Sequence, residues 1–291
     1  MISSIDLSLN NKESFENAKE NFSLTAKKMI SDRHFSFIYQ RNDIATALGN
    51  LSLMEQKLFD YCTSLINKND KYDAKYCESI SSVMKTLNLK NSGLNKKRVI
   101  AAYLKLIRQV FIVWDGKTRT FRPFNIFNLE NSYYSPEADL IGFSFSSYIS
   151  PYLFFLRNRY YAYPLMLTTR LSSKYSMIAV RLMSAADHGE KKIILKGSLY
   201  EWESWMGLIN ENGKMKYTAS QMRQFVFNVL LKELSLYFSH YTFSIKNILD
   251  GHKVKGYKFI INKDDYVMNL KNPMSDEILA IEKNEKLHSL K

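Results

Sequence analysis

The stretch that decides the fold reads Gly213-Lys-Met-Lys-Tyr-Thr-Ala-Ser-Gln-Met-Arg-Gln224, and an apolar-periodic run follows it. From Thr218 onward apolar residues recur at helical spacing, which predicts one long helix with a single buried face. Thr218 and Gln221 have the spacing of a capping box, so we expect the helix to begin there. The buried face is expected to contain Met222, Phe225, Val226, Val229, Leu230, Leu234 and Phe238.

The other face of this helix carries polar side chains that can pair with base edges and phosphates. These are Ser220, Gln221, Arg223, Gln224 and Asn228, and Lys214, Lys216 and Tyr217 precede them near the helix N-terminus. Residues 241–246 then alternate apolar and polar, and Asp250-Gly251 predicts a turn. Residues 252–261 predict a returning strand with His252, Lys253, Lys255 and Lys258. A helix followed by a basic hairpin is typical of a winged helix.

The composition predicts a folded chain with a polyanionic partner. The 291 residues are 46% hydrophobic, which supports a sizeable core in one large domain or two ordinary ones. Lys and Arg number 41 against 28 Asp and Glu, a formal net charge of +13. This balance favours nucleic acid or an anionic membrane surface. Arg157 and Arg159 interrupt the most apolar stretch and no secretory pattern opens the sequence, so we expect no membrane span and a cytoplasmic location.

The same order of elements is expected twice along the chain. Only the order repeats, since residue identity between the halves is negligible. The first half predicts helices at 42–48, 52–66, 79–87 and 95–109, and strands at 35–39, 110–114, 117–121 and 140–145. The second half predicts helices at 163–171, 173–183 and 198–206 and a strand at 192–195 before the long helix. Each half closes with an Asp-Gly hairpin, at Asp115-Gly116 and at Asp250-Gly251.

This repetition predicts an α+β fold of two tandem winged-helix domains in a pseudo-two-fold arrangement. We expect the domains at 34–150 and 151–262, with a flexible arm at 1–33 and a tail at 263–291. The second domain is expected to make the main sequence-specific contacts. The first is expected to contact the DNA backbone, although some of its charges also fit an ordinary solvated surface. Its candidates are Lys96, Lys97, Arg98 and Lys105.

The sequence offers little for catalysis or metal binding. The five histidines form no His-x-His or His-x-x-x-His pair, which argues against a metal-dependent nuclease. Cys62 and Cys77 form no metal or disulfide pattern, and Cys62 is expected in the core. Tyr257 stands where a phosphate loop after Gly251 and Gly256 would need Lys. None of the nineteen tyrosines has an identifiable activating base. We therefore predict a non-enzyme with no cofactor or metal.

Three blocks of sequence form an ordered pattern over residues 39–262. In the first, residues 42–57, Asn42 lies ahead of Leu51-Ser52, and Glu55 precedes Lys57. The second, residues 171–182, carries Leu, Ser and Tyr before Arg181-Leu182. The third comprises 198–202, Lys216-Tyr217, Arg223, 232–234, 250–254 and 257–261. No block is specific alone, but together their order and spacing resemble the Rep_3 family of plasmid replication initiators, which bind iteron repeats.

The resemblance implies an initiator that binds double-stranded DNA at direct origin repeats as a monomer. It implies that the protein opens an adjacent AT-rich segment and recruits the host replication initiator and the replicative helicase. It also implies a homodimer, formed largely through the first domain and in equilibrium with the monomer, that represses its own promoter at an inverted repeat and takes part in copy control. The chain departs from the family at Met183, Leu231 and His252, where Tyr, Pro and Arg are common. A neutral imidazole at His252 attracts phosphate less than a guanidinium does, which weakens one expected wing contact.

Two other functions fit parts of the pattern. A winged-helix transcriptional regulator without an origin function would show the same binding chemistry. A replication enzyme that nicks DNA belongs to another class, and magnesium-dependent cleavage of supercoiled origin DNA would support it.

Overall fold

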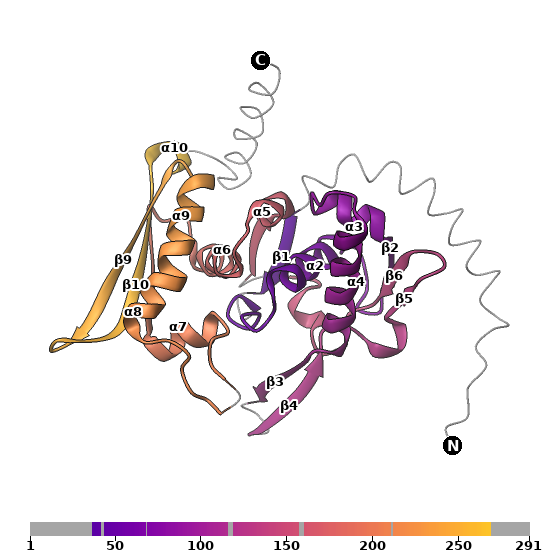
Figure 1. The fold of residues 1–291 in the computed structure, drawn as a ribbon, viewed down its shortest axis with the longest axis horizontal. Coiled ribbons are helices and arrows are strands. Elements are labelled where there is room, and N and C mark those ends of the chain that lie inside the picture. The colour runs from indigo at the N-terminus through magenta and orange to yellow at the C-terminus, as the bar shows by residue number, and fades with distance from the viewer. Residues whose placement is uncertain are drawn as a thin grey trace, which may run out of the picture.

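The computed structural model describes residues 37–41, 44–67, 69–115, 119–156, 160–210 and 212–268. The expected arm at 1–33 and the tail from 269 onward lie outside these residues, as does the turn at 116–118. Helices and antiparallel sheets alternate along the described chain (Figure 1), which confirms a mixed α and β fold. None of the described helices is long and apolar enough to cross a membrane.

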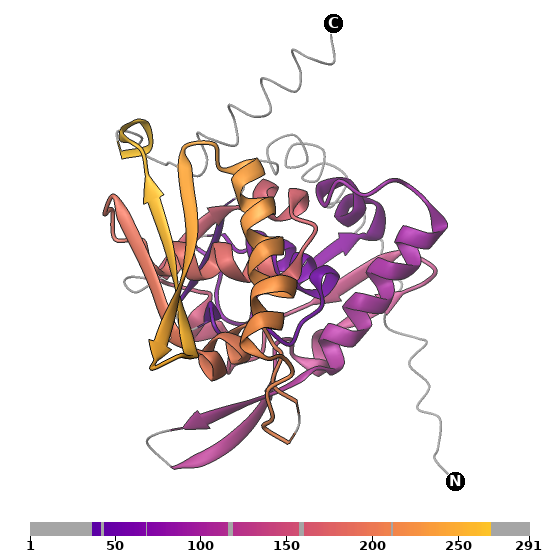
Figure 2. The same ribbon diagram turned by 60° about the vertical axis from the view of Figure 1, so that its left-hand side comes forward.

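The first half builds a helical layer with a small sheet and a projecting hairpin. Its helices are α2 (Leu53–Ser64), α3 (Ile80–Thr86) and α4 (Gly93–Arg108). The strands β2 (Tyr76–Ser79), β6 (Leu140–Phe143) and β5 (Tyr133–Ser135) form one sheet in that order. The strands β3 (Val110–Asp115) and β4 (Thr120–Asn125) form the hairpin that follows α4 and projects from the body (Figure 2).

The second half packs helices against one face of a three-stranded sheet. It contains α5 (Leu165–Arg170), α6 (Lys174–Ala186), α7 (Leu199–Trp205), α8 (Ala219–Met222), α9 (Asn228–Tyr237) and α10 (Asp265–Met268). The sheet has the order β8 (Lys192–Ser198), β10 (Lys253–Lys263) and β9 (Tyr241–Asp250). The inner face meets α7 and α8, where Trp202 Nε1 donates to the Tyr257 carbonyl oxygen at 3.0 Å and the Tyr257 hydroxyl donates to the Ala219 carbonyl oxygen at 2.6 Å.

Three capping boxes begin helices at predicted helix starts. Ser52 with Glu55 begins α2, Ser198 with Glu201 begins α7, and Thr218 with Gln221 begins α8. In each case the cap side chain accepts from the third helical amide while the third side chain accepts from the cap amide, so the helix start is fixed locally.

The halves are joined by a short sheet and a buried polar cluster. Strand β1 (Phe37–Arg41) pairs with β7 (Tyr160–Pro164), so a sheet crosses the expected boundary near residue 150. Beside it Arg181 on α6 donates to Asp60 Oδ1 on α2 at 2.9 Å and to the Tyr163 hydroxyl at 3.0 Å, and all three side chains are buried. Burial is the largest influence and lowers the pKa of Arg181, but Asp60, Tyr163 and Tyr161 together outweigh it and raise that pKa above its usual range.

The long helix is interrupted by a wide turn that the apolar pattern did not predict. Between α8 and α9, Arg223–Phe227 is π-helical. The core positions Met222, Val226, Leu230, Leu234 and Phe238 are four residues apart, whereas an α-helix has 3.6 residues per turn. A turn with one extra residue rotates this row back toward the core.

The wide turn also corrects the predicted buried face. Phe225 and Val229 were expected in the core, but they are 44% and 42% exposed. Phe227 is fully buried instead, with its ring 5.1 Å from Trp202 and 4.7 Å from Tyr257. The rotation at the π-helical turn is the physical reason for the exchange.

Other predicted elements differ in extent. The helix expected at 42–48 is a series of turns within its described part, held by the Ala47 amide donating to the Ile44 carbonyl oxygen. The strand expected at 117–121 begins at Thr120, and β2, β5 and β7 were not predicted. These three strands have five residues or fewer, too short for a clear alternating pattern. Cys62 is a buried free thiol, as predicted.

Candidate nucleic-acid interface

The loop before α8 is anchored by a buried carboxylate that sequence reasoning missed. Glu203 on α7 is 1% exposed and accepts from the Lys216 amide at 2.6 Å and from the Tyr217 amide at 2.9 Å. The side chains of these two residues then stack, with Lys216 Nζ 5.3 Å from the Tyr217 ring centroid. A preformed loop therefore presents Lys216 at the helix N-terminus. The backbone amides of residues 216 and 217 lie in a predicted loop, where no strand or helix provides them with an acceptor. Their need for a hydrogen-bond partner is the signal in the sequence that points to such a carboxylate.

The exposed side of the α8–α9 helix combines amide, basic and apolar groups. Gln221 forms the capping box, so its Oε1 is occupied by the Thr218 amide and hydroxyl. Arg223 lies on the flank beside β9, with Nη1 3.5 Å from Asn247 Oδ1. Residues 214–232 include four basic residues and no Asp or Glu; the basic residues are Lys214, Lys216, Arg223 and Lys232. Ser220, Gln221, Arg223, Gln224 and Asn228 are all exposed, together with Phe225 and Val229.

The β9–β10 hairpin places some of the predicted basic residues at its turn and one of them in the middle of the sheet, away from the turn. Gly251 has φ of +57°, a left-handed conformation that suits glycine, and His252 and Lys253 follow it at the exposed tip. Lys255 lies at a register shift between Val254 and Gly256, with Nζ 3.6 Å from Asp250 Oδ2. Lys258 is not at the tip, because its cross-strand neighbours are Lys246 and Lys196 in the middle of the sheet.

The predicted basic residues of α4 divide into two kinds. Lys96 is ion-paired with Asp139 at 2.9 Å. Lys105 is ion-paired at 2.9 Å with Glu55, whose side chain is 4% exposed. Lys97 and Arg98 are exposed. To bind phosphate, Lys96 and Lys105 would have to weaken or leave their ion pairs with carboxylates. Lys97 and Arg98 are therefore better placed to bind phosphate.

A lysine that was not among the predicted DNA-binding residues lies between the two halves. Lys174, at the N-terminus of α6, donates to the Gly49 carbonyl oxygen at 3.3 Å and lies 5.3 Å from the Tyr175 ring centroid. Burial lowers the pKa of Lys174, and the positive charge of Lys216 lowers it further. Glu55 acts in the opposite direction and raises it. Lys174 and Lys216 therefore repel each other, and an anion beside them would reduce that repulsion.

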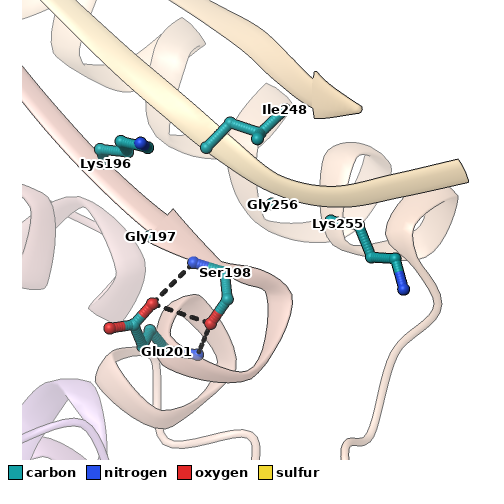
Figure 3. A pocket seen from close by; sticks show the side chains of 7 residues that line it. All are labelled: Lys196, Gly197, Ser198, Glu201, Ile248, Lys255 and Gly256. Carbon is teal, nitrogen blue, oxygen red and sulfur yellow. Dashed lines mark hydrogen bonds between the residues drawn. The ribbon is translucent and has the colours of Figure 1, made fainter. Parts of the chain in front are cut away.

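The described residues contain no group of three His, Cys, Asp or Glu side chains that could hold a metal ion. The close-up in Figure 3 shows a surface pocket where β8 ends, lined by Lys196, Ser198, Glu201 and Lys255 among others. Glu201 accepts from the Ser198 amide and hydroxyl there, and the amide hydrogen bond is the main reason that the pKa of Glu201 is lowered. Its carboxylate thus serves as a helix cap.

A capped helix with a basic, amide-rich surface, followed by a lysine-bearing hairpin, has the outline of the winged-helix proteins. Residues 37–184, more than half of the chain, match the family model described as initiator replication protein, WH1. The chain belongs to this family of replication initiators, as its sequence blocks predicted.

One solved structure supports the same fold, and two others are more distant. The chain resembles the crystal structure of Pi initiator protein in complex with iteron DNA, with a TM-score of 0.67 and 18% identity over 80% of this chain and 99% of that one. Two structures of domains 2 and 3 of RctB give TM-scores of 0.43 and 0.39, with 10% and 12% identity. They cover 73% and 74% of this chain and 81% and 82% of theirs. Comparison with curated protein sequences finds no match.

Proposed function

We propose that this protein is a plasmid replication initiator that binds directly repeated sites, or iterons, in its origin DNA. The observation that carries the proposal is the α8–α9 helix, whose exposed polar residues between 214 and 232 include no Asp or Glu, followed by the lysine-bearing hairpin tip. An α-helix with its side chains is about 10–12 Å across, so it fits a major groove about 12 Å wide. Family membership and the fold shared with an iteron-bound initiator support the same function.

The proposed architecture is two winged-helix units, at 34–150 and 151–262, that contact successive major grooves. In the second unit Gln224, Asn228 and Arg223 read bases, while Lys214, Lys216, Lys253 and Lys255 bind phosphates. In the first unit α4 contacts the backbone through Lys97 and Arg98. Lys174 and Lys216, between the units, bind the phosphates that lie between the two grooves. Fixing both units on one body, through the β1–β7 sheet and the Arg181–Asp60 pair, supports a defined spacing between the two contacts.

The finer steps follow from the family resemblance. The monomer initiates replication at direct repeats, opens AT-rich DNA and recruits the host initiator and helicase. A dimer formed through the first unit represses the gene's own promoter. Geometry separates the two species, because a two-fold dimer matches an inverted repeat whereas a monomer matches direct repeats.

Footprinting on the DNA that flanks the protein's own gene tests the proposal. We expect protection of several direct repeats, with equal spacing and the same polarity. Protection of an inverted repeat alone would contradict the origin function and favour a transcriptional regulator. Incubation of supercoiled origin DNA with the protein and magnesium should leave the DNA uncut, and a nicked product would support the enzymatic alternative.

A further inference from the structure

Three lysines form a row across the outer face of the β8–β10–β9 sheet. Lys258 on the central strand lies directly opposite Lys196 on β8 and Lys246 on β9. All three side chains are exposed. Since neighbouring strands are about 4.7–4.9 Å apart, three ammonium-bearing side chains start within about 10 Å of one another.

This row of like charges has no ion pair with a described carboxylate. Like charges directly opposite each other on a sheet are destabilising. None of the three lysines forms an ion pair with another described residue, and two carboxylates of this region have other partners. Asp250 lies 3.6 Å from Lys255, and Glu201 accepts two hydrogen bonds from Ser198. An external polyanion would remove the repulsion.

The row faces away from the helix that we propose to read DNA. On β10, Tyr257 contacts Ala219 and Phe227 of the long helix, so the alternate residue Lys258 points to the other face of the sheet. In Figure 1 the β9 and β10 strands form one edge of the molecule, with α7 to α9 on their inner side. Lys258 is also five residues from Lys253 at the tip, about 16 Å along an extended strand. A duplex held by the helix and the tip is therefore not the natural partner of this row.

Further lysines extend the basic surface in both directions. Lys192 is exposed at the start of β8, and Lys255 lies with Lys196 on the rim of the pocket in Figure 3. All of these cations are lysines. Lysine is depleted at protein–protein interfaces, where arginine and aromatic residues are enriched. Phosphate backbones, in contrast, bind chiefly through charge.

We propose that this outer sheet face is a second nucleic-acid-binding surface, on which Lys196, Lys246 and Lys258 bind phosphates of a segment other than the one held by the long helix. The inference rests on the proposed DNA-binding function and extends it to two segments at once. The second segment is either duplex or single-stranded, since both offer the same phosphodiester charges.

The experiment saturates the full chain with the duplex found by footprinting and then adds a second, fluorescent DNA. One arm uses a random-sequence duplex and the other an unstructured single strand, and anisotropy is followed from low to high salt. We expect the wild-type complex to bind one of them. The triple variant Lys196→Gln/Lys246→Gln/Lys258→Gln should lower its logarithmic salt slope by about 2.7 for duplex, or about 2.1 for single strand, three phosphates being lost. Affinity for the first duplex should stay within about twofold of wild type, since its helix contacts lie on the other face and its hairpin contacts, Lys253 and Lys255, are left in place.

A charge-matched control separates this row from the net charge of the protein. Lys71→Gln/Lys75→Gln/Lys85→Gln removes three exposed lysines of the first half and should leave the second binding unchanged.

A measurement of thermal stability tests the row without any nucleic acid. Lys258→Gln, at the centre of the row, should raise the melting temperature at low salt, and the gain should vanish at high salt as screening removes the repulsion.

Four outcomes would overturn the inference: no second binding by the wild type, full second binding by the row variant, an equal loss of both bindings, or capture of polyglutamate in preference to either DNA. Failure of the proposed function is a different result, because it would appear as the absence of any preferred first duplex.

Discussion

The backbones of Gly49 and Gly207 lie against each other where the two halves of the molecule meet. A Cβ atom added to Gly207 would lie 2.0 Å from the Gly49 carbonyl oxygen, and one added to Gly49 would lie 2.2 Å from the Trp205 carbonyl oxygen. Gly207 also has φ of +63°, which favours glycine. Only glycine fits at either position, so this contact holds the α7 end close to the first half.

Gly207→Ala should therefore destabilise the protein for two reasons, a left-handed backbone and a backbone clash. Gly213→Ala is the matched control, because Gly213 has φ of +72° with nothing within 4 Å of an added Cβ. We expect the control to cost about 1–2 kcal/mol in free energy of unfolding. Gly207→Ala should cost clearly more in urea titrations, and equal values for the two variants would show that the halves separate easily.

Local signals in the sequence predicted local structure well. The capping boxes at Ser52 and Thr218 each depend on residues three positions apart, and each begins a helix as predicted. The helix predicted at 198–206 also begins with a capping box, at Ser198. The family was also predicted, because its motifs keep their order over residues 39–262. The exposure of Phe225 was missed, since helical periodicity assumes 3.6 residues per turn and does not register a π-helical turn.

Partners distant in the sequence could not be predicted. Lys96 and Lys105 looked like free basic residues of α4, but they pair with Asp139 and Glu55, 43 and 50 positions away. The neighbouring sequence does not indicate ion-pair partners so far away in the chain. The same holds for Glu203, whose buried carboxylate binds amides thirteen and fourteen residues later.

Loss of the buried Arg181–Asp60 pair should destabilise the protein strongly. Arg181→Met leaves the Asp60 carboxylate buried without its cation, and we expect about 3–5 kcal/mol of lost stability in chemical denaturation. Arg181→Met/Asp60→Leu should be less destabilised than the sum of its single variants, because the unpaired charge is then gone. The exposed pair Lys191–Asp265 is the control, and Lys191→Met should change stability by about 0.5 kcal/mol or less. Similar losses at both pairs would show that burial of the first one has no energetic consequence.

The hairpin tip should contribute phosphate contacts to the specific duplex. Lys253→Ala/Lys255→Ala is expected to lower the logarithmic salt slope of binding by about 1.8, at about 0.9 for each contact. Lys192→Ala removes an exposed lysine at the opposite end of the same sheet, where Lys192 pairs with Asn262, and should leave the slope for this duplex unchanged. A fluorescence titration between low and high salt measures both. An unaltered slope in the tip variant would exclude the hairpin from the interface.

Phe225 and Val229 should read thymine through its methyl group. They are exposed on the side of the helix that carries Glu233 one turn further on, where its carboxylate accepts from Ser172 and Ser173, and the Phe225 ring is supported by Tyr217 at 5.6 Å between centroids. Apolar side chains contact the C5-methyl of thymine in the major groove. Residues four apart on a helix have Cβ atoms about 5–6 Å apart, so the two thymines should lie about two base steps from each other.

Replacing one thymine at a time with deoxyuridine removes only that methyl group and tests this directly. At about 0.8 kcal/mol per buried methylene-sized group, wild type should lose about fourfold in affinity at each thymine it contacts. Phe225→Ala should bind the thymine duplex about as weakly as wild type binds the deoxyuridine duplex at one position, with no further loss when both changes are combined. Leu236→Ala, which removes a 70% exposed apolar side chain from the far end of the same helix, should keep full sensitivity to the methyl group. If Phe225→Ala also keeps that sensitivity at every thymine, the exposed ring does not face the bases, because a side chain that contacts a methyl group cannot be removed without losing the response to it.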